Sequence, residues 1–221
     1  MRAEQPKAVH LADYRVPAFV IDHVDLRVEL FEGHSLVYSR LQIRRNPEDD
    51  SEARELVLHG EELELVSLML DGRPVEGHRI DEGSLTVPSV PDQFHLDITT
   101  RIHPQNNTRL EGLYQSSGMF CTQCEPEGFR RITYFLDRPD VMACYRTRIE
   151  AQQHTYPVLL ANGNPVDWGE LGDGRHQVTW EDPYPKPSYL FAMVAGDLVE
   201  KRDEFVTGSG RTIDLRMYVE A

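Results

Sequence analysis

The amino-acid sequence predicts an all-β fold of the sandwich kind, on the strength of two observations. Apolar and polar residues alternate with period two through much of the chain, which places the apolar side chains on one face of an extended backbone. Short runs of this kind recur between turn-rich segments, a spacing typical of β-sandwiches. The 221 residues are enough for one large domain or two small ones with a buried core.

The first predicted strands form a hairpin near the N-terminus. Apolar residues alternate with charged residues over 24–30, and the alternation returns in phase over 37–43. The segment 32–34 between them, Glu-Gly-His, has the composition of a turn.

Shorter strands are predicted up to about residue 100. Spaced leucines over 63–70 precede an Asp-Gly-Arg-Pro turn, and apolar runs return over 85–87 and 94–98. The stretch 47–58 is ambiguous, because residues 52–56 are also compatible with a helical turn.

The C-terminal half predicts three further extended segments. Residues 143–150 alternate, 188–199 form the most apolar run and predict a buried central strand, and 213–219 alternate again. Glycine-containing turn clusters lie at 162–164 and 172–174.

Proline predicts a break in this pattern just before the apolar run. Residues 182–187 contain three prolines, each of which removes a backbone N–H that a β-ladder needs. This segment is therefore predicted to be a loop.

Composition excludes several classes of partner. The formal net charge of −14 argues against nucleic acid, which is normally met by clustered Lys and Arg. No apolar run approaches the roughly 18 residues that span a bilayer, and the N-terminus leads into no signal segment, so no membrane partner is expected. Three cysteines are sparse usage, typical of a reducing compartment. A cytoplasmic location is predicted.

The residues that catalyse hydrolysis in common enzymes are missing from this sequence. The nine histidines form no His-x-His or His-x-x-x-His pair, so we expect no metal ligands in the chain. There is also no Gly-x-Ser-x-Gly motif and no phosphate-binding glycine loop, and no catalytic residue is predicted. The acidic pairs Glu61-Glu62 and Asp49-Asp50 are interpreted as solvated surface.

Cys121 and Cys124 form a C-x-x-C motif. A zinc knuckle needs four ligands, and only Cys144 remains. In an extended segment positions i and i+3 point to opposite faces, which disfavours a disulfide. We predict structural or free thiols, and from spacing alone Gln123 between them is a strand or loop amide of no special role.

Residues 106–140 mix polar side chains, glycines and aromatics without a period, as functional loops on a β scaffold do. Residues 137–140, Asp-Arg-Pro-Asp, are predicted to form a structural turn in which an aspartate accepts backbone N–H bonds. Trp168 and Trp180 are interpreted as core or edge packing.

Several ordered motifs in this stretch and after it resemble the N-terminal domain of the bacterial aminopeptidase N family. The resemblance spans essentially the whole chain and is strongest over 106–197. The motifs are Asn107-Thr108 with Leu110-Glu111-Gly112-Leu113-Tyr114-Gln115-Ser116, Cys121-Thr122-Gln123-Cys124-Glu125, Gly128-Phe129-Arg130, Tyr134 with Leu136-Asp137-Arg138-Pro139-Asp140-Val141, Leu160 with Asn162-Gly163-Asn164, and Pro185-Lys186-Pro187 with Tyr189-Leu190-Phe191-Ala192 and Val194-Ala195-Gly196-Asp197.

The resemblance implies a saddle-shaped, mostly antiparallel β domain that precedes a thermolysin-like catalytic domain in a zinc aminopeptidase. The family's His-Glu-x-x-His and Gly-x-Met-Glu-Asn motifs are not in this sequence. Residues 1–221 are thus expected to be an N-terminal domain that packs on its own catalytic domain. The chain alone is expected to bind no zinc and to hydrolyse no peptide, while the parent enzyme uses zinc and acts on peptides.

One functional residue is carried over by the resemblance. In the family, the glutamine of the Cys-Thr-Gln-Cys-Glu segment hydrogen-bonds the free α-amino group of the substrate, which assigns substrate binding to Gln123. Glu125 and Glu127 are candidates for lining the same cavity. The alternative is a stand-alone β-sandwich module that binds peptides or carbohydrates without catalysis. The end of the chain at Ala221, within a predicted strand, favours a piece of a longer protein over the module.

Overall fold

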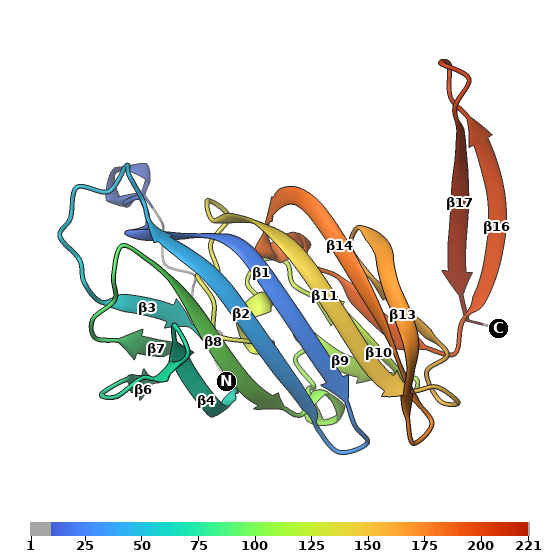
Figure 1. Cartoon of the computed structure of the whole chain (residues 1–221), viewed down its shortest axis with the longest axis horizontal. Coiled ribbons are helices and arrows are strands. Elements are labelled where there is room, and N and C mark those ends of the chain that lie inside the picture. Colours follow the sequence, from blue (N-terminus) through green and yellow to red (C-terminus); the bar gives the residue numbers. More distant parts are fainter. Residues whose placement is uncertain (1–9, 221) are drawn as a thin grey trace.

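Residues 10–220, which the computed structural model describes, are built almost entirely from β-strands (Figure 1). The all-β prediction is confirmed. The elements in chain order are η1 (Leu11–Asp13), β1 (Phe19–Leu30), β2 (Ser35–Arg45), β3 (Leu56–His59), β4 (Glu64–Leu70), β5 (Arg73–Pro74), β6 (Arg79–Asp81), β7 (Ser84–Val87), β8 (Gln93–Ile102), η2 (Pro104–Asn106), β9 (Gly112–Ser116), β10 (Met119–Gln123), η3 (Phe129–Arg131), β11 (Met142–Gln152), β12 (Val158–Ala161), β13 (Asn164–Gly172), β14 (Arg175–Pro187), η4 (Ser188–Leu190), β15 (Met193–Gly196), β16 (Val199–Val206) and β17 (Thr212–Val219).

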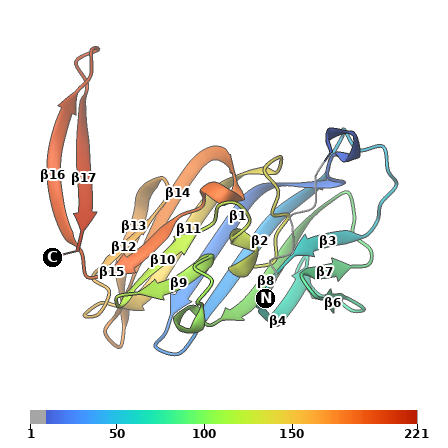
Figure 2. The ribbon, with the colours of Figure 1, turned by 180° about the vertical axis from the view of Figure 1, so that it is seen from behind.

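A large curved sheet and two smaller sheets form the body of the molecule. The large sheet has the order β13-β14-β11-β1-β2-β8-β4-β5, and its strand pairs are antiparallel except for β1 with β11. The sheets β12-β15-β10-β9 and β3-β7-β6 lie behind it in Figure 1 and in front of it in Figure 2. The apolar core fills the space between these layers.

The predicted hairpin is confirmed as β1 and β2. Val28 lies opposite Val37, and the backbone N–H of Phe31 donates to the carbonyl of His34 to close the turn. The alternation places one face of both strands in the core, where Leu26 and Leu41 are fully buried. The other face carries the charged side chains.

The ambiguous stretch 47–58 forms no helix. Residues 51–55 have no regular structure, and Leu56–His59 is the strand β3, with Leu56 and Leu58 buried. The tertiary burial of these two leucines, two residues apart, selects the extended backbone.

The prediction of a loop over 182–187 was wrong, because the strand β14 continues to Pro187. Asp182 lies opposite Tyr145, and Lys186 lies opposite Ala143, so the three residues between them form a wide bulge. Pro183 and Pro185 fall in this bulge, where no ladder donor is needed. Lys186 Nζ reaches back to Asp182 over 2.9 Å.

The apolar run 188–199 is not one buried strand. It begins with the short helix η4, and only Met193–Gly196 forms a strand, β15, which does lie in the interior of its sheet. Val199 begins a different sheet and is half exposed. Trp168, interpreted as packing, lies on the edge strand β13 with 69% of its surface exposed.

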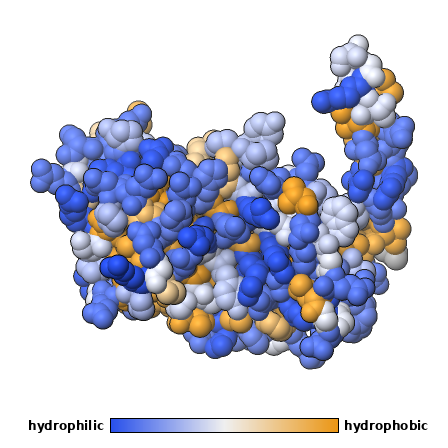
Figure 3. Space-filling view, viewed as in Figure 1, coloured by the Kyte–Doolittle hydropathy of each residue, from blue (hydrophilic) through white to orange (hydrophobic). Residues whose placement is uncertain are grey.

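The last two strands form a hairpin that projects from the body (Figures 1 and 2). Because residues alternate between its faces, one face carries charged side chains such as Glu200 and Arg216, which form an ion pair. The other face is mainly apolar and exposed. Figure 3 shows apolar side chains next to hydrophilic ones on this hairpin. The apolar residues of this face are Val199, Phe205, Ile213, Leu215, Met217 and Val219, and Lys201 and Asp203 lie among them.

Candidate functional site

Gln123 is the last residue of β10, and its side chain is exposed. The strand pairs with β9 on one side and β15 on the other, and Gln123 lies opposite Gly112. Residues 124–128, called here the Gln123 loop, follow it and lead into η3. The backbone N–H of Gly128 donates to the carbonyl of Cys124 over 2.8 Å and closes the loop.

The amide of Gln123 is oriented by its own loop. Its Nε2 donates to the backbone carbonyl of Glu125 over 3.2 Å. The donor end of the amide is thereby engaged, and the carbonyl oxygen Oε1 is left to accept a hydrogen bond.

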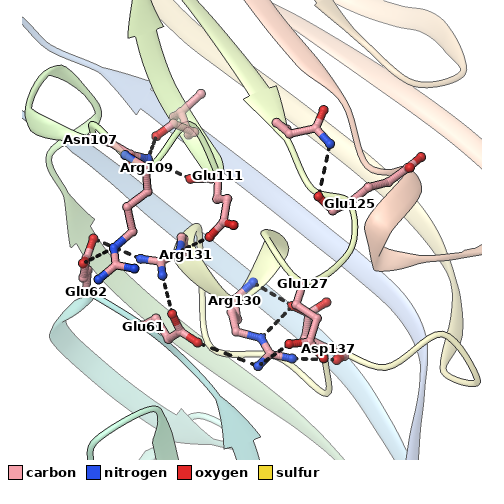
Figure 4. A network of polar contacts seen from close by, with 12 residues as sticks. Glu61, Glu62, Asn107, Arg109, Glu111, Glu125, Glu127, Arg130, Arg131 and Asp137 are labelled. Carbon is pink, nitrogen blue, oxygen red and sulfur yellow. Dashed lines mark hydrogen bonds and ion pairs between the residues drawn. The ribbon is translucent and has the colours of Figure 1, made fainter. Parts of the chain in front are cut away.

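The two glutamates of the Gln123 loop have different surroundings. Glu127 forms an ion pair with Arg130, with 3.2 Å between Oε2 and Nη1. Glu125 is exposed and has no ion-pair partner among residues 10–220. In Figure 4 it lies apart from the arginines, next to the hydrogen bond from Gln123.

Asp137 fixes the helix η3 that follows the loop. Its carboxylate, 1% exposed, accepts the backbone N–H and the Nε–H of Arg130, and also the hydroxyl of Ser188 over 2.5 Å. A turn is present at the predicted place, but the backbone N–H that Asp137 accepts comes from Arg130 in η3 and not from the turn. The turn itself is closed by the N–H of Val141, which donates to Arg138.

Arg131, the next residue, is buried among three carboxylates (Figure 4). It hydrogen-bonds Glu61 and, over 3.2 Å, Glu111. Its Nη1 also lies 3.0 Å from Glu62, in an orientation that makes an ion pair without a hydrogen bond. Glu61 and Glu62 keep 37% and 60% of their side-chain surface exposed, as the interpretation of a solvated face implies, but both also pair with the buried guanidinium, which needs charged partners.

An aromatic cluster in the core packs against η3 through Phe129. Phe129 is fully buried and packs edge-on against Phe135, Tyr145 and Phe191, with ring centroids 4.8–6.0 Å apart. These rings come from the following turn, from the large sheet and from the segment before β15. The Gln123 loop therefore ends on a rigid part of the core.

The three cysteines are free thiols, as predicted. Cys124 is buried in the core, and burial raises the pKa of its thiol, with a further contribution from Asp137. Cys121 is partly exposed on the strand before it. Neither forms a disulfide, in agreement with the prediction that side chains three residues apart in an extended segment point to opposite faces.

The described residues do not fit a metal ion. In residues 10–220, His, Cys, Asp and Glu side chains nowhere gather in threes with the geometry of a metal site.

No helix within this range is long and apolar enough to cross a membrane.

A comparison with known proteins settles the family. The model of the peptidase M1 N-terminal domain matches residues 20–190. The chain belongs to this family. Aminopeptidase N of Caulobacter vibrioides is 49% identical over 222 residues, which cover 100% of this chain and 25% of that protein. Aminopeptidase N of Escherichia coli is 48% identical over 217 residues, with coverages of 98% and 25%.

Solved structures agree with this assignment. A crystal structure of Legionella pneumophila aminopeptidase A in complex with aspartic acid superposes with a TM-score of 0.89 at 38% identity, covering 94% of this chain and 25% of that one. An M1 zinc metallopeptidase from Deinococcus radiodurans, at 17% identity and a TM-score of 0.75, shares the fold. This M1 domain spans about a quarter of the length of the curated relatives named above.

The sequence indicated Gln123 through the resemblance alone, and it missed the residues that hold the loop. Asp137 had been assigned only to a turn, and the pairing of Arg130 and Arg131 with distant acids has no local signal. Glu61 precedes Arg131 by 70 residues. The isolated bridge between His59 and Phe135, and the backbone N–H of Glu61 that donates to the carbonyl of Arg130 over 3.0 Å, bring these segments together.

Proposed function

We propose that this chain is the N-terminal β domain of a zinc aminopeptidase that releases N-terminal amino acids from peptides. Within it, Gln123 binds the free α-amino group of the substrate. The observation that carries this role is the orientation of the side-chain amide of Gln123. Its Nε2 donates to the backbone carbonyl of Glu125, and its oxygen Oε1 is left as an acceptor.

The chemistry of these groups suits an ammonium ion. A carbonyl oxygen accepts an N–H from a positively charged amine, and such charge-assisted hydrogen bonds are stronger than neutral ones. The neighbouring carboxylate of Glu125 has no arginine or lysine partner in the described part of the chain, so its negative charge adds to the attraction. Glu127 is neutralised by Arg130 and is a weaker candidate.

The rest of the active site would come from another part of the parent enzyme. The described residues do not fit zinc, and the sequence lacks the His-Glu-x-x-His motif. Zinc, its ligands and the general base are therefore assigned to a catalytic domain that follows this one. The contribution of Gln123 is to bind the free α-amino group of the peptide substrate.

The projecting hairpin supports packing against that catalytic domain. A two-stranded hairpin is marginally stable alone in water, and this one exposes an apolar face on both of its strands. On that face Phe205 is 58% exposed and Val219 54%. The relatives are about four times as long as this chain, so the catalytic domain is the occupant to which we assign this face.

Replacing Gln123 by Ala in the full-length enzyme tests the proposal. Loss of one charge-assisted hydrogen bond in the transition state should cost about 1.5–3 kcal/mol, which is roughly a 10- to 100-fold fall in kcat/KM. Gln153→Ala is the matched control, because its side chain is exposed and makes no hydrogen bond in the described residues. Zinc content and melting temperature should stay unchanged in both variants. Unchanged kinetics of Gln123→Ala would refute the role.

A further inference from the structure

The backbones of three segments meet where Gln123 leaves β10. Gln123 lies opposite Gly112 in the ladder, and Gly128 at the end of the Gln123 loop lies against both. A Cβ added to Gly128 would fall 2.3 Å from the backbone carbonyl oxygen of Gln123 and 2.8 Å from the backbone nitrogen of Gly112. Real Cβ atoms essentially never approach other atoms this closely, so any side chain here displaces backbone.

Gly128 is required for this contact and not for its own conformation. Its φ of −81° and ψ of −19° lie in the right-handed helical region, which every residue adopts. The absent side chain therefore serves the close approach of the neighbouring backbones, of which Gln123 is the nearest.

Gly112 is fixed from the opposite side. Its φ of +72° favours glycine, and a Cβ on it would lie 2.7 Å from Cβ of Arg131. The side-chain amide of Asn107 donates to the carbonyls of Glu111 and Leu113, over 2.7 and 3.0 Å, and so holds the residues on both sides of Gly112.

The contact is anchored to the rigid part of the domain. Phe129, directly after Gly128, is fully buried, and Arg131 is held by its carboxylates. A shift at Gly128 is therefore taken up by the exposed end of β10, where Gln123 lies, and not by the core.

We propose that Gly128, and Asn107 acting through Gly112, are positioning residues that set the place of Gln123 in the enzyme. This inference rests on the proposed role of Gln123. The backbones of Gln123, Gly112 and Gly128 pack against one another with no side chain between them. The main chain of Gln123 therefore has no room to move, and this keeps its side-chain oxygen Oε1 in a fixed position. Misplacement of a binding group by about an ångström costs up to roughly 100-fold in rate.

A double-mutant cycle in the full-length enzyme tests the proposal. Gly128→Ala should lower kcat/KM by about 10-fold or more, and the loss should vanish when Gln123 is already Ala. Gly33→Ala is the control, since a Cβ there meets nothing within 4 Å. A loss from Gly128→Ala that persists undiminished in the Gln123→Ala background overturns the positioning role. A Gln123→Ala enzyme with normal kinetics instead overturns the proposed function itself.

Asn107→Ala provides a milder variant should Gly128→Ala fail to fold. It removes the two hydrogen bonds beside Gly112 and a third that Asn107 accepts from the backbone N–H of Arg109, and it leaves the packing of Phe129 intact. We expect a several-fold fall in kcat/KM that is again absent in the Gln123→Ala background, with unchanged zinc content. Asn106→Ala, whose exposed side chain makes no hydrogen bond in the described range, should have no effect. An additive effect of Asn107→Ala, or none, contradicts the inference.

Discussion

Arg130 donates its backbone N–H and its Nε–H to the same carboxylate oxygen of Asp137, at 3.2 and 3.0 Å. A third bond runs from Nη2 to the backbone carbonyl of Asp137. One residue pair thus ties η3 to the segment that leads into the turn at 138–141. The Gln123 loop depends on this pair, because η3 is its C-terminal support.

Asp137→Ala should strongly destabilise the domain. It leaves the largely buried guanidinium of Arg130 without its closest partner and Ser188 without an acceptor. Removal of one member of a buried ion pair costs about 3–5 kcal/mol. Urea unfolding of the 221-residue chain measures this, and Asp50→Ala, at an exposed position, should change the unfolding free energy by no more than about 0.5 kcal/mol. Equal midpoints for the two variants would contradict the assignment.

His59 should make the domain less stable in mild acid. Burial, assisted by Arg130, lowers the pKa of His59, and its Nδ1 accepts the backbone N–H of Asp137 only while the ring is neutral. Below about pH 6.5 the unfolded state takes up a proton that the folded state does not, so stability falls as the pH falls. Thermal unfolding between pH 7.5 and 5.5 should show a weaker dependence in His59→Gln than in the unchanged chain. Identical slopes would show that His59 does not contribute.

Cys124 should be the least reactive thiol of the native protein. Burial excludes reagents, and its raised pKa keeps the nucleophilic thiolate scarce. Brief labelling with iodoacetamide, followed by peptide mass analysis, should modify Cys121 and Cys144 well before Cys124. Labelling after denaturation should modify all three alike. Early modification of Cys124 would show that the Gln123 loop opens readily.

The apolar face of the projecting hairpin should behave differently in the 221-residue chain and in the full-length enzyme. Replacing Leu215 and Met217 by Ser should leave the melting temperature of the isolated chain almost unchanged, because both side chains are exposed there. In the full-length enzyme the same change should destabilise by about 1.5–3 kcal/mol for each side chain that becomes buried. Equal, negligible effects in both would show that the catalytic domain does not cover this face.

The sequence by itself determined the strands whose alternation matches burial on one face. The β1–β2 hairpin and β17 follow directly from residues spaced two apart, since this period is a property of the extended backbone. The free thiols of Cys121 and Cys124 were predictable for the same reason. Gln123 could be singled out because an ordered motif surrounds it.

Only the tertiary structure decided the features that join distant segments. Pro183 and Pro185 are accommodated because the opposite strand tolerates a bulge, which local composition does not reveal. Glu61 and Arg131 lie 70 residues apart, and only the folded sheets bring the carboxylate to the buried guanidinium. The close approach of Gly128 to Gln123 is likewise between backbones, and backbone proximity leaves no pattern in a sequence except a glycine.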